Sequence, residues 1–193
     1  MTPDTAEKIL FTAARTHRSF TDKAVETSLL HELYELVKFF PTASNLNPMR
    51  VVFVTSELQK QQVADAAAAG NKPKIESAAV VAIIARDQAF HQHVERLAPH
   101  MNAEAFCEQD EQVLEDIAHE NCWLQAGAFI AAARLLGLDC GPMSGFDKQR
   151  IDADFFADSS WRSEMLINLG YGDKDKLYPR GERLHFDEAC LIL

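Results

Sequence analysis

Apolar residues recur every three or four positions in some stretches and run without interruption in others, and this contrast predicts the elements of the fold. Between residues 26 and 40, helical spacing places apolar side chains on one face, at Leu29, Leu30, Leu33, Leu36 and Val37. Pro41 ends this helix, because a proline disfavours helical backbone in the residue before it. The unbroken runs at 51–54 and 78–85 are short and rich in β-branched residues, which predicts buried strands.

The remaining segments are interpreted by the same criteria. Ser56 is the expected N-cap of a helix that Gly70 ends. Further helices are expected at 2–15, weakly at 88–101, at 110–136, shortly after Phe146 and at 186–190, and further strands at 139–143 and 164–170. We see no repeat, low-complexity tract or linker, so residues 1–193 are predicted to form a single α+β domain, a small mixed sheet flanked by helices.

One apolar stretch is long enough to raise the question of a membrane. Residues 122–138 are nearly all apolar, but the run is slightly short for a bilayer and contains Gln125 and Arg134. We therefore predict a helix buried on most of its faces, in the core or against a partner subunit, and no membrane partner. The polar N-terminal segment shows no basic start followed by an apolar run, so no secretory signal is expected.

Composition and charge narrow the classes of function. The 193 residues are 47% hydrophobic and 25% charged, which is ordinary for a globular protein. The formal net charge of −10 disfavours a broad nucleic-acid interface, so a phosphate site would need a local cluster of arginines and lysines. The four cysteines show neither a CxxC pair nor metal-ligand spacing, which indicates reduced thiols and a cytoplasmic protein.

Two polar clusters follow predicted helices. The run Arg15-Thr16-His17-Arg18 offers two planar guanidinium groups and a hydroxyl, which suit a phosphate, although cations at a solvated helix end are the alternative. Residues 41–48 place amide and hydroxyl side chains in a proline-bounded turn, which suits the edge of a heterocycle. Helix capping and an Asx turn explain that second cluster equally well.

Two further basic segments occur in this acidic chain. Asn71 and Lys74 lie just past the helix end at Gly70, where a surface loop is the alternative. Arg180 and Arg183 lie near the C-terminus, where a salt-bridged surface turn is the alternative. Taken singly, each segment favours its ordinary structural interpretation, so their weight comes from occurring together.

A turn within residues 139–147 combines two glycines, a proline and a serine. Glycine lets backbone approach a flat ligand closely because no Cβ intervenes, and the N–H groups of such a turn can face a ring. A plain helix-to-strand connection is the alternative. Ser144 does not match a hydrolase nucleophile, because Pro142 and Phe146 occupy the glycine positions of GxSxG.

Other chemistries lack their motifs. His91, His93 and His100 have no HExxH or histidine-plus-carboxylate spacing, so a solvated helix face is favoured over a metal site. The chain has no GxGxxG after a strand and no GxxxxGK[ST], so it shows no Rossmann or P-loop nucleotide site. Cys140 is a candidate nucleophile only by its position, and a buried small apolar residue is favoured.

The order of these motifs resembles that of the flavin-dependent nitroreductase family, over essentially the whole chain. The matching segments are 15–18, 41–49, Asn71 with Lys74, 141–147, 170–172 and Arg183. Within the family, LDCGPMSGFD and INLGYGD resemble the malonic semialdehyde reductase subgroup of pyrimidine degradation. Three positions depart from the common family pattern, since Thr42, Asn47 and Met49 stand where many members have serine, glutamine and tryptophan. The middle of the chain is also short, in the region that helps cover the flavin in relatives.

The resemblance implies a three-layer α+β fold and an intertwined homodimer with FMN at the subunit interface. The FMN phosphate would be held by basic and hydroxyl side chains, the ring would lie against the backbone of the glycine-containing turn, and the proline-bounded turn would come from the partner subunit. The implied cofactor-binding residues are Arg15, Thr16, His17, Arg18, Thr42, Ala43, Ser44, Asn45, Asn47, Asn71, Lys74, Pro142, Met143, Ser144, Gly145, Arg180 and Arg183.

The resemblance also implies an activity, ping-pong hydride transfer from transiently bound NADH or NADPH through FMN to a small-molecule acceptor. No side chain is assigned a catalytic role, because the flavin N5 carries the hydride. The expected acceptor is malonic semialdehyde, reduced to 3-hydroxypropanoate, with Lys74 or His17 as a partner for its carboxylate. A general NAD(P)H nitro- or quinone reductase is the alternative, and a non-catalytic flavin-binding protein is a third hypothesis.

Overall fold

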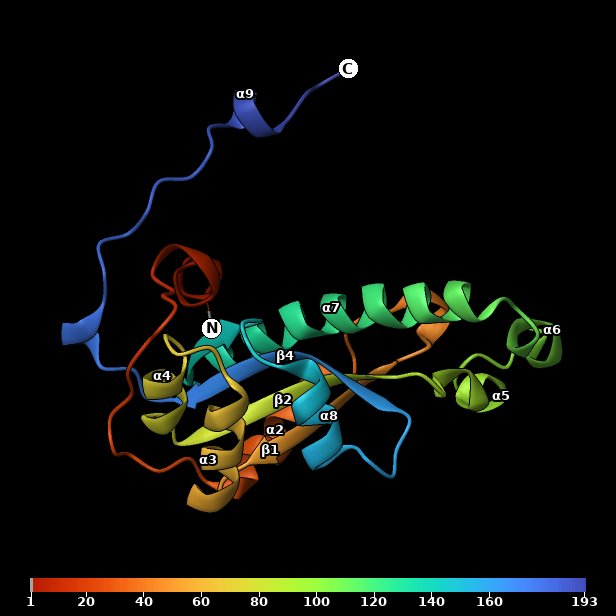
Figure 1. The fold of residues 1–193 in the computed structure, drawn as a ribbon. Coiled ribbons are helices and arrows are strands. Elements are labelled where there is room, and N and C mark those ends of the chain that lie inside the picture. Colours follow the sequence, from red (N-terminus) through yellow and green to blue (C-terminus); the bar gives the residue numbers. More distant parts are fainter. Residues whose placement is uncertain (1) are drawn as a thin grey trace.

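A computed structural model describes residues 2–193 (Figure 1). One sheet has the strand order β1-β2-β4-β3. The strands are β1 (Met49–Val54), β2 (Val80–Asp87), β3 (Asp139–Met143) and β4 (Trp161–Gly170). All three pairings are antiparallel, so the predicted α+β class is confirmed but the sheet is antiparallel rather than mixed. Apolar runs identify buried strands without fixing their directions, which depend on pairing between distant segments.

Helices and short helical turns fill the connections. They are α1 (Pro3–Glu7), η1 (Lys8–Thr12), α2 (Thr27–Val37), η2 (Ala43–Asn45), α3 (Glu57–Ala66), α4 (Lys72–Glu76), η3 (Phe90–His93), α5 (Val94–Leu97), α6 (Ala103–Cys107), α7 (Glu111–Leu135), α8 (Lys148–Phe155), η4 (Lys174–Lys176) and α9 (Phe186–Ala189). The predicted first helix is split, because its second half, η1, is a π-helix. The short helices α4 and α6 were not predicted, since five residues carry little periodicity.

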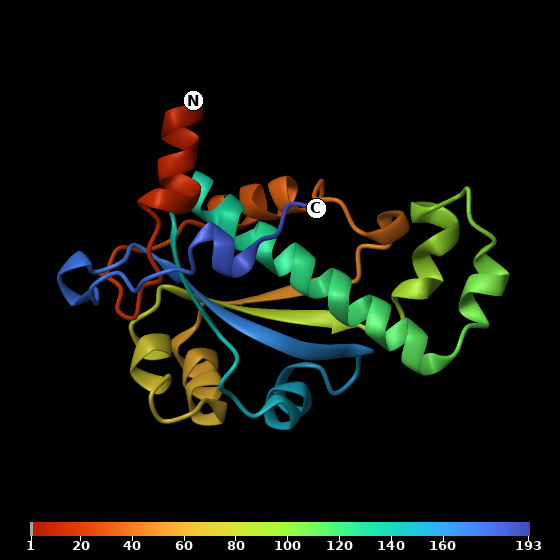
Figure 2. The same ribbon diagram turned by 90° about the horizontal axis from the view of Figure 1, so that it is seen from above.

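Helices cover both faces of the sheet and make the predicted three layers (Figures 1 and 2). Side chains of a strand alternate between faces, and β2 follows this rule closely. Val80, Ala82 and Ile84 join the buried cluster that includes residues of α2 and α7. Val81, Ile83 and Ala85 join the opposite cluster, which includes residues of α3, α4 and α8. The central strand is therefore buried on both faces, which explains its unbroken apolar sequence.

Helix α7 is the long helix that the apolar stretch predicted. Asp110 caps it by accepting from the Gln112 backbone N–H at 2.8 Å, and Gly137, at φ 81°, follows its end. Its buried residues, among them Ala118, Cys122 and Phe129, face the rest of the domain. Within residues 2–193, no helix combines the length and apolarity needed to cross a membrane.

A β-bulge at one end of the sheet creates a buried ionic cluster. The register between β2 and β4 shifts after Ile84, and Glu164 is left without a partner on β2. Its carboxylate is 1% exposed and accepts from Arg86, from His119 Nδ1 at 2.9 Å and from Lys148 Nζ at 3.0 Å. Trp123 Nε1 donates to it as well, at 3.2 Å. Every lone-pair direction of this carboxylate is therefore used by the fold.

The chain after β4 first returns to the domain and then leaves it. Residues around η4 contact the N-terminal segment, where Asp173 N donates to Ser19 O at 3.0 Å. Beyond Arg180 the chain runs away from the body of the molecule and carries α9 (Figure 1). This C-terminal arm, residues 181–193, exposes its apolar side chains, namely Leu184, Phe186, Leu191, Ile192 and Leu193.

Candidate functional site

A basic cavity of about 520 Å³ lies between the end of η1, the end of α7 and the segment after η4. Five arginines line it, namely Arg15, Arg18, Arg134, Arg180 and Arg183. Within residues 2–193, none of these five guanidinium groups pairs with a carboxylate. In a chain of net charge −10, such a concentration of unpaired cations is chemically suited to an anion.

Backbone carbonyls orient several of these arginines. Arg15 Nη2 donates to Tyr178 O, and Arg180 Nη2 donates to Ala14 O at 2.8 Å. The Arg18 guanidinium lies 4.3 Å from the centre of the Tyr178 ring. Arg134 reaches in from α7 and donates to Leu10 O at 3.0 Å. A carbonyl oxygen orients a guanidinium without neutralising it, so the positive charge stays available for a ligand.

His17 lies behind this cavity rather than in it. Its ring is 4% exposed, and Nε2 is 3.3 Å from Asp139 Oδ1. Its backbone N donates to Cys140 O at 3.0 Å. A Cβ at Gly172 would lie 1.9 Å from His17 Nδ1, so the ring fits only against a glycine. The resemblance expects His17 beside the phosphate, but Thr16 and Arg18 line the cavity and His17 does not. The His17 ring instead packs inward beside Asp139 of β3.

Strand β3 connects the basic cavity to Asn71 and Lys74. Thr16 bridges to Cys140 near the start of β3, and past its end Gly145 O accepts from Asn71 Nδ2 at 2.9 Å. Lys74 Nζ donates to Asn71 Oδ1 at 2.7 Å, which completes a chain of three groups. A Cβ at Gly145 would lie 2.9 Å from Asn71 Nδ2, so glycine permits this approach. The edge strand thus places Pro142–Gly145 between the unpaired arginines and an amide–ammonium pair.

The proline-bounded turn forms a loop at residues 42–47 with unusual backbone. Ser44, Asn45 and Asn47 have φ of 47°, 59° and 46°, in the left-handed region that residues other than glycine seldom adopt. Asn47 Nδ2 donates to Asn45 O at 2.6 Å, and Asn47 N donates to Thr42 Oγ1 at 3.2 Å. Such backbone conformations are concentrated at binding and catalytic sites.

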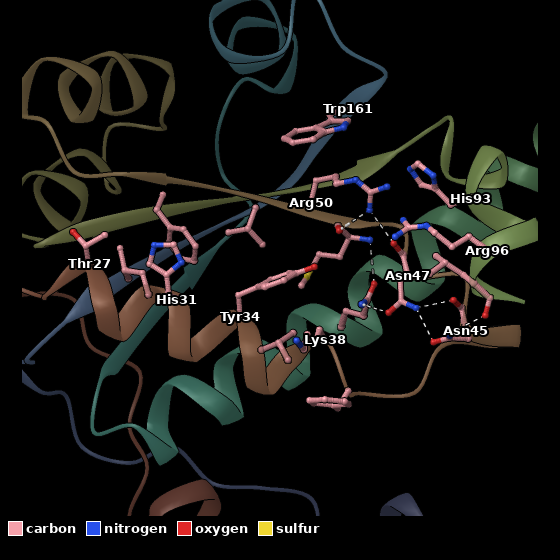
Figure 3. A pocket seen from close by; sticks show the side chains of 18 of the residues that line it. Thr27, His31, Tyr34, Lys38, Asn45, Asn47, Arg50, His93, Arg96 and Trp161 are labelled. Atoms are coloured by element: carbon pink, nitrogen blue, oxygen red, sulfur yellow. Dashed lines mark hydrogen bonds between the residues drawn. The ribbon is translucent and has the colours of Figure 1, made fainter.

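The loop 42–47 does not meet the basic cavity within one chain. Its Asn45 and Asn47 instead line one end of a groove of about 950 Å³ along β1 (Figure 3). Arg50 lies beside them, α2 contributes His31 and Tyr34 to the groove, and Lys38 follows the end of α2 (Figure 3). Of the predicted site residues, the structure therefore brings together Arg15, Thr16, Arg18, Arg180 and Arg183, joins Asn71, Lys74 and Gly145 separately, and leaves residues 42–47 apart.

The candidate nucleophile Cys140 is excluded by its surroundings, and the second buried thiol, Cys122, is inert for the same reason. Cys140 is fully buried, and this burial raises the pKa of its thiol to about 12. Burial likewise raises the pKa of Cys122 to about 12. Neither thiol forms the reactive thiolate at neutral pH. No cluster of three or more histidine, cysteine or acidic residues among residues 2–193 has the arrangement of a metal site.

Several residues of the site were missed by sequence reasoning. Tyr178 positions Arg15 and Arg18, and Arg134 supplies a further cation from the apolar helix. Asn121 and Gln125 of α7 bind the loop 42–47, since Ala43 N donates to Asn121 Oδ1 at 2.7 Å. For the residues of α7, the polar side chain was itself the available sequence signal, because an amide or a cation inside an apolar helix needs a polar partner.

Comparisons with known proteins agree with this geometry. The family described as the nitroreductase family matches residues 12–171. Proteins of Ralstonia nicotianae and of Stenotrophomonas maltophilia strain K279a are 45% and 49% identical to this chain over 95% of its length, which corresponds to 94% and 93% of their own. Both carry the provisional name NADH dehydrogenase/NAD(P)H nitroreductase.

Solved structures share the fold at lower identity. A Bacillus subtilis protein provisionally named nitroreductase ydfN has a TM-score of 0.87 and 23% identity, over 98% of this chain and 100% of that one. A provisionally named nitroreductase of Exiguobacterium sibiricum, solved in complex with FMN, has a TM-score of 0.83 and 20% identity over 96% of both chains. Together with the family match and the identity of the sequence relatives, this fold shows that the chain belongs to the nitroreductase family.

Proposed function

We propose that this protein is an FMN-dependent NAD(P)H oxidoreductase that works as a homodimer. The observation that carries the proposal is a cavity whose five arginines have no carboxylate partner in the described part of the chain, joined by an edge strand to the Asn71–Lys74 pair. An elongated ligand with a phosphate at one end and a flat polar ring at the other matches this distribution of donors. The names of the relatives, and the FMN complex of a structural neighbour, support the same cofactor.

The basic cavity fits the phosphate end of FMN. Arg15 and Arg18 are held by Tyr178 with their charges uncompensated, and Thr16 adds a hydroxyl. Guanidinium groups bind phosphate oxygens through paired N–H donors, which fixes orientation as well as position. Arg180 and Arg183 would close the cavity from the C-terminal side.

The backbone past β3 fits the ring end. Gly145 lets Asn71 approach closely, and Lys74 holds the Asn71 oxygen, so the amide is fixed in one orientation. Bound FMN supplies an N5 position that accepts and releases hydride, and the residues of this chain supply its orientation and a positive field. In this proposal Lys74 stabilises negative charge on the ring, and Met143 and Ser144 shape the surface beside it.

Two features support the homodimer. The loop 42–47 has the strained backbone typical of a functional site but lies apart from the cavity of its own chain, so a second chain would be needed to unite them. Apolar side chains are also exposed on α7, at Trp123 and Leu124, and on the C-terminal arm. Exposed apolar surface at these two places is typical of a protein–protein interface.

The names of the relatives favour one class of acceptor. Their shared name, NADH dehydrogenase/NAD(P)H nitroreductase, supports the alternative of a general NAD(P)H reductase with a nitro acceptor over malonic semialdehyde. Reduction of malonic semialdehyde rests on the sequence resemblance alone and stays a prediction. The ratio of turnover with the semialdehyde to turnover with a nitroarene separates the two.

The first experiment is the visible absorption spectrum of the purified protein, before and after anaerobic addition of NADH or NADPH. Oxidised-flavin bands that bleach with either coenzyme are the expected result. A protein that stays colourless after incubation with FMN would overturn the cofactor assignment. Flavin bands that neither coenzyme bleaches would instead support a flavin-binding protein without turnover.

A further inference from the structure

Helix α7 presents two buried amides to the loop 42–47. Asn121 is 7% exposed and Gln125 is 3% exposed. They lie four residues apart, one turn of helix, so both side chains emerge on the same face. Among residues 2–193 they have no ionic partner, and their polar atoms are satisfied largely by the loop and the strand that follows it.

The two amides together fix both ends of the loop. Asn121 Oδ1 accepts from Ala43 N at 2.7 Å, while its Nδ2 donates to Ile117 O at 2.9 Å. Gln125 Oε1 accepts from Met49 N at 3.0 Å, while its Nε2 donates to Asn47 Oδ1 at 3.3 Å. Each amide therefore uses both its acceptor and its donor, which allows one orientation of the side chain.

The loop needs this support because its backbone is strained. Ser44, Asn45 and Asn47 all adopt positive φ, and none of them is glycine. A residue in this region persists only where the surrounding structure determines its conformation. Two further contacts hold the loop, from Asn45 Nδ2 to Leu97 O at 2.9 Å and from Arg50 Nη1 to Asn47 O at 2.9 Å. Without the two α7 amides, the loop would keep its internal bonds but lose its attachment to the helix.

We propose that Asn121 and Gln125 are positioning residues, which hold the loop 42–47 in the strained conformation needed to contact FMN bound to the partner subunit. This inference rests on the proposed function. Because the same helix exposes Trp123 and Leu124 between the two amides, the loop is tied to the element that would form the subunit interface. The amides themselves touch no ligand and act only through the loop.

The test compares four proteins, the wild type, Asn121→Ala, Asn121→Asp and Gln125→Ala, with Gln112→Ala as the matched control. Gln112 is an exposed amide of the same helix that contacts Asp116 and not the loop. Hydrogen exchange of the peptide spanning residues 42–49 measures loop fixation in the protein as purified. Fluorescence titration of FMN into the apoprotein measures affinity.

We expect Asn121→Ala and Gln125→Ala to speed exchange in residues 42–49 and to weaken FMN affinity about tenfold, the effect of one lost buried hydrogen bond. Asn121→Asp keeps the oxygen that accepts from Ala43 N but loses the donor to Ile117 O, so it is expected to recover part of the affinity that Asn121→Ala loses. Gln112→Ala is expected to behave as the wild type in both measurements.

Two results would overturn the proposal. One is exchange and affinity in both alanine variants equal to those of Gln112→Ala. The other is faster exchange with unchanged FMN affinity, which would make the amides merely structural. If the wild type itself fails to bind FMN, the proposed function fails and this inference with it, whereas an affinity lost only in the variants leaves the proposed function standing.

Discussion

Cations gather in two regions of this acidic chain, and they are compensated in opposite ways. Around Glu164, Arg86 and Lys148 converge on a carboxylate that is 1% exposed. Around the basic cavity, Arg15 and Arg180 bond only to backbone carbonyls. The first cluster is complete without a ligand. The second retains its net charge, and in the proposed function an anion from outside compensates it.

The same contrast appears in the pKa of the carboxylate. Burial alone would raise the pKa of Glu164, but hydrogen bonds from His119, Lys148 and Trp123 outweigh it and lower the pKa below its ordinary value. A perturbed titratable group often marks a functional site, yet here the cause is a closed network of the fold. The cluster around Glu164 and the basic cavity therefore differ in whether their cations have carboxylate partners, more than in the number of cations.

The largest expected effect follows from breaking the closed cluster. Replacing Glu164 with alanine leaves the buried Arg86 with Glu115 as its remaining ionic partner and leaves the half-exposed Lys148 without its carboxylate. We expect the free energy of unfolding to fall by about 3 kcal/mol, the lower end of what is typical when one partner of a buried ion pair is removed, because Glu115 still compensates Arg86. Urea unfolding of the apoprotein measures this. The exposed pair of Asp4 and Lys8 is the control, and Asp4→Asn should change the same quantity by less than about 0.5 kcal/mol.

The pH dependence of unfolding sharpens this expectation. Because the pKa of Glu164 is lowered in the folded state, its stabilisation is present above the ordinary carboxylate pKa and is lost as the pH falls through the lowered value. The free energy of unfolding should therefore decline as the pH falls below about 4.5, and the decline should be shallower in Glu164→Gln. Equal slopes in the two proteins would contradict the assignment.

Breaking the support behind the basic cavity should have the next largest effect. In Gly172→Ala the new Cβ meets the His17 ring, which has no room to move because it is buried against β3. We expect a loss of about 1–3 kcal/mol in unfolding free energy, typical of overpacking, and weaker FMN binding, since Arg15 and Arg18 flank the displaced segment. Gly70→Ala, where a Cβ meets nothing within 4 Å, is the control.

How far the sequence predicts this molecule depends on whether the signal is local. Helix α7 was expected at 110–136 and spans Glu111–Leu135, and the strand expected at 139–143 is β3. Apolar spacing and capping residues lie within a few positions of the element they define, so these bounds are readable. Strand direction and the bulge at Glu164 depend on pairing with β2, eighty residues earlier in the chain, and no local pattern contains them.

The residues of the candidate site show the same difference between local and distant signals. The residue types for a phosphate were visible in Arg15 to Arg18, but the sequence placed His17 among them, whereas the structure turns its ring inward against Gly172. Gln125 was noticed only as a polar residue that argues against a membrane span. Its partners at Asn47 and Met49 lie more than seventy residues away, so its role in holding the loop required the fold.

Removing one arginine from the open cluster tests the other side of the comparison. We expect Arg15→Ala to weaken FMN binding about tenfold or more, the effect of losing charged hydrogen bonds to a phosphate, while unfolding of the apoprotein changes by less than about 1 kcal/mol. Arg162 is the matched control, because it also bonds backbone carbonyls but does not line the cavity. A large loss of stability with unchanged FMN affinity would place Arg15 in the fold and not in the site.

Salt should produce the smallest effect, and it should act on one cluster only. The arginines around the cavity face solvent, so raising the ionic strength from about 0.05 to 0.5 M shortens the screening length and is expected to weaken FMN affinity about threefold. The contribution of Glu164, measured as the difference in unfolding free energy between the wild type and Glu164→Ala, should change little over the same range, because a buried pair is screened much less. Arg15→Ala should show a weaker salt dependence of FMN affinity than the wild type, since one of the screened contacts is gone. If the two clusters responded equally to salt, the distinction between a closed structural network and an open binding site would fail.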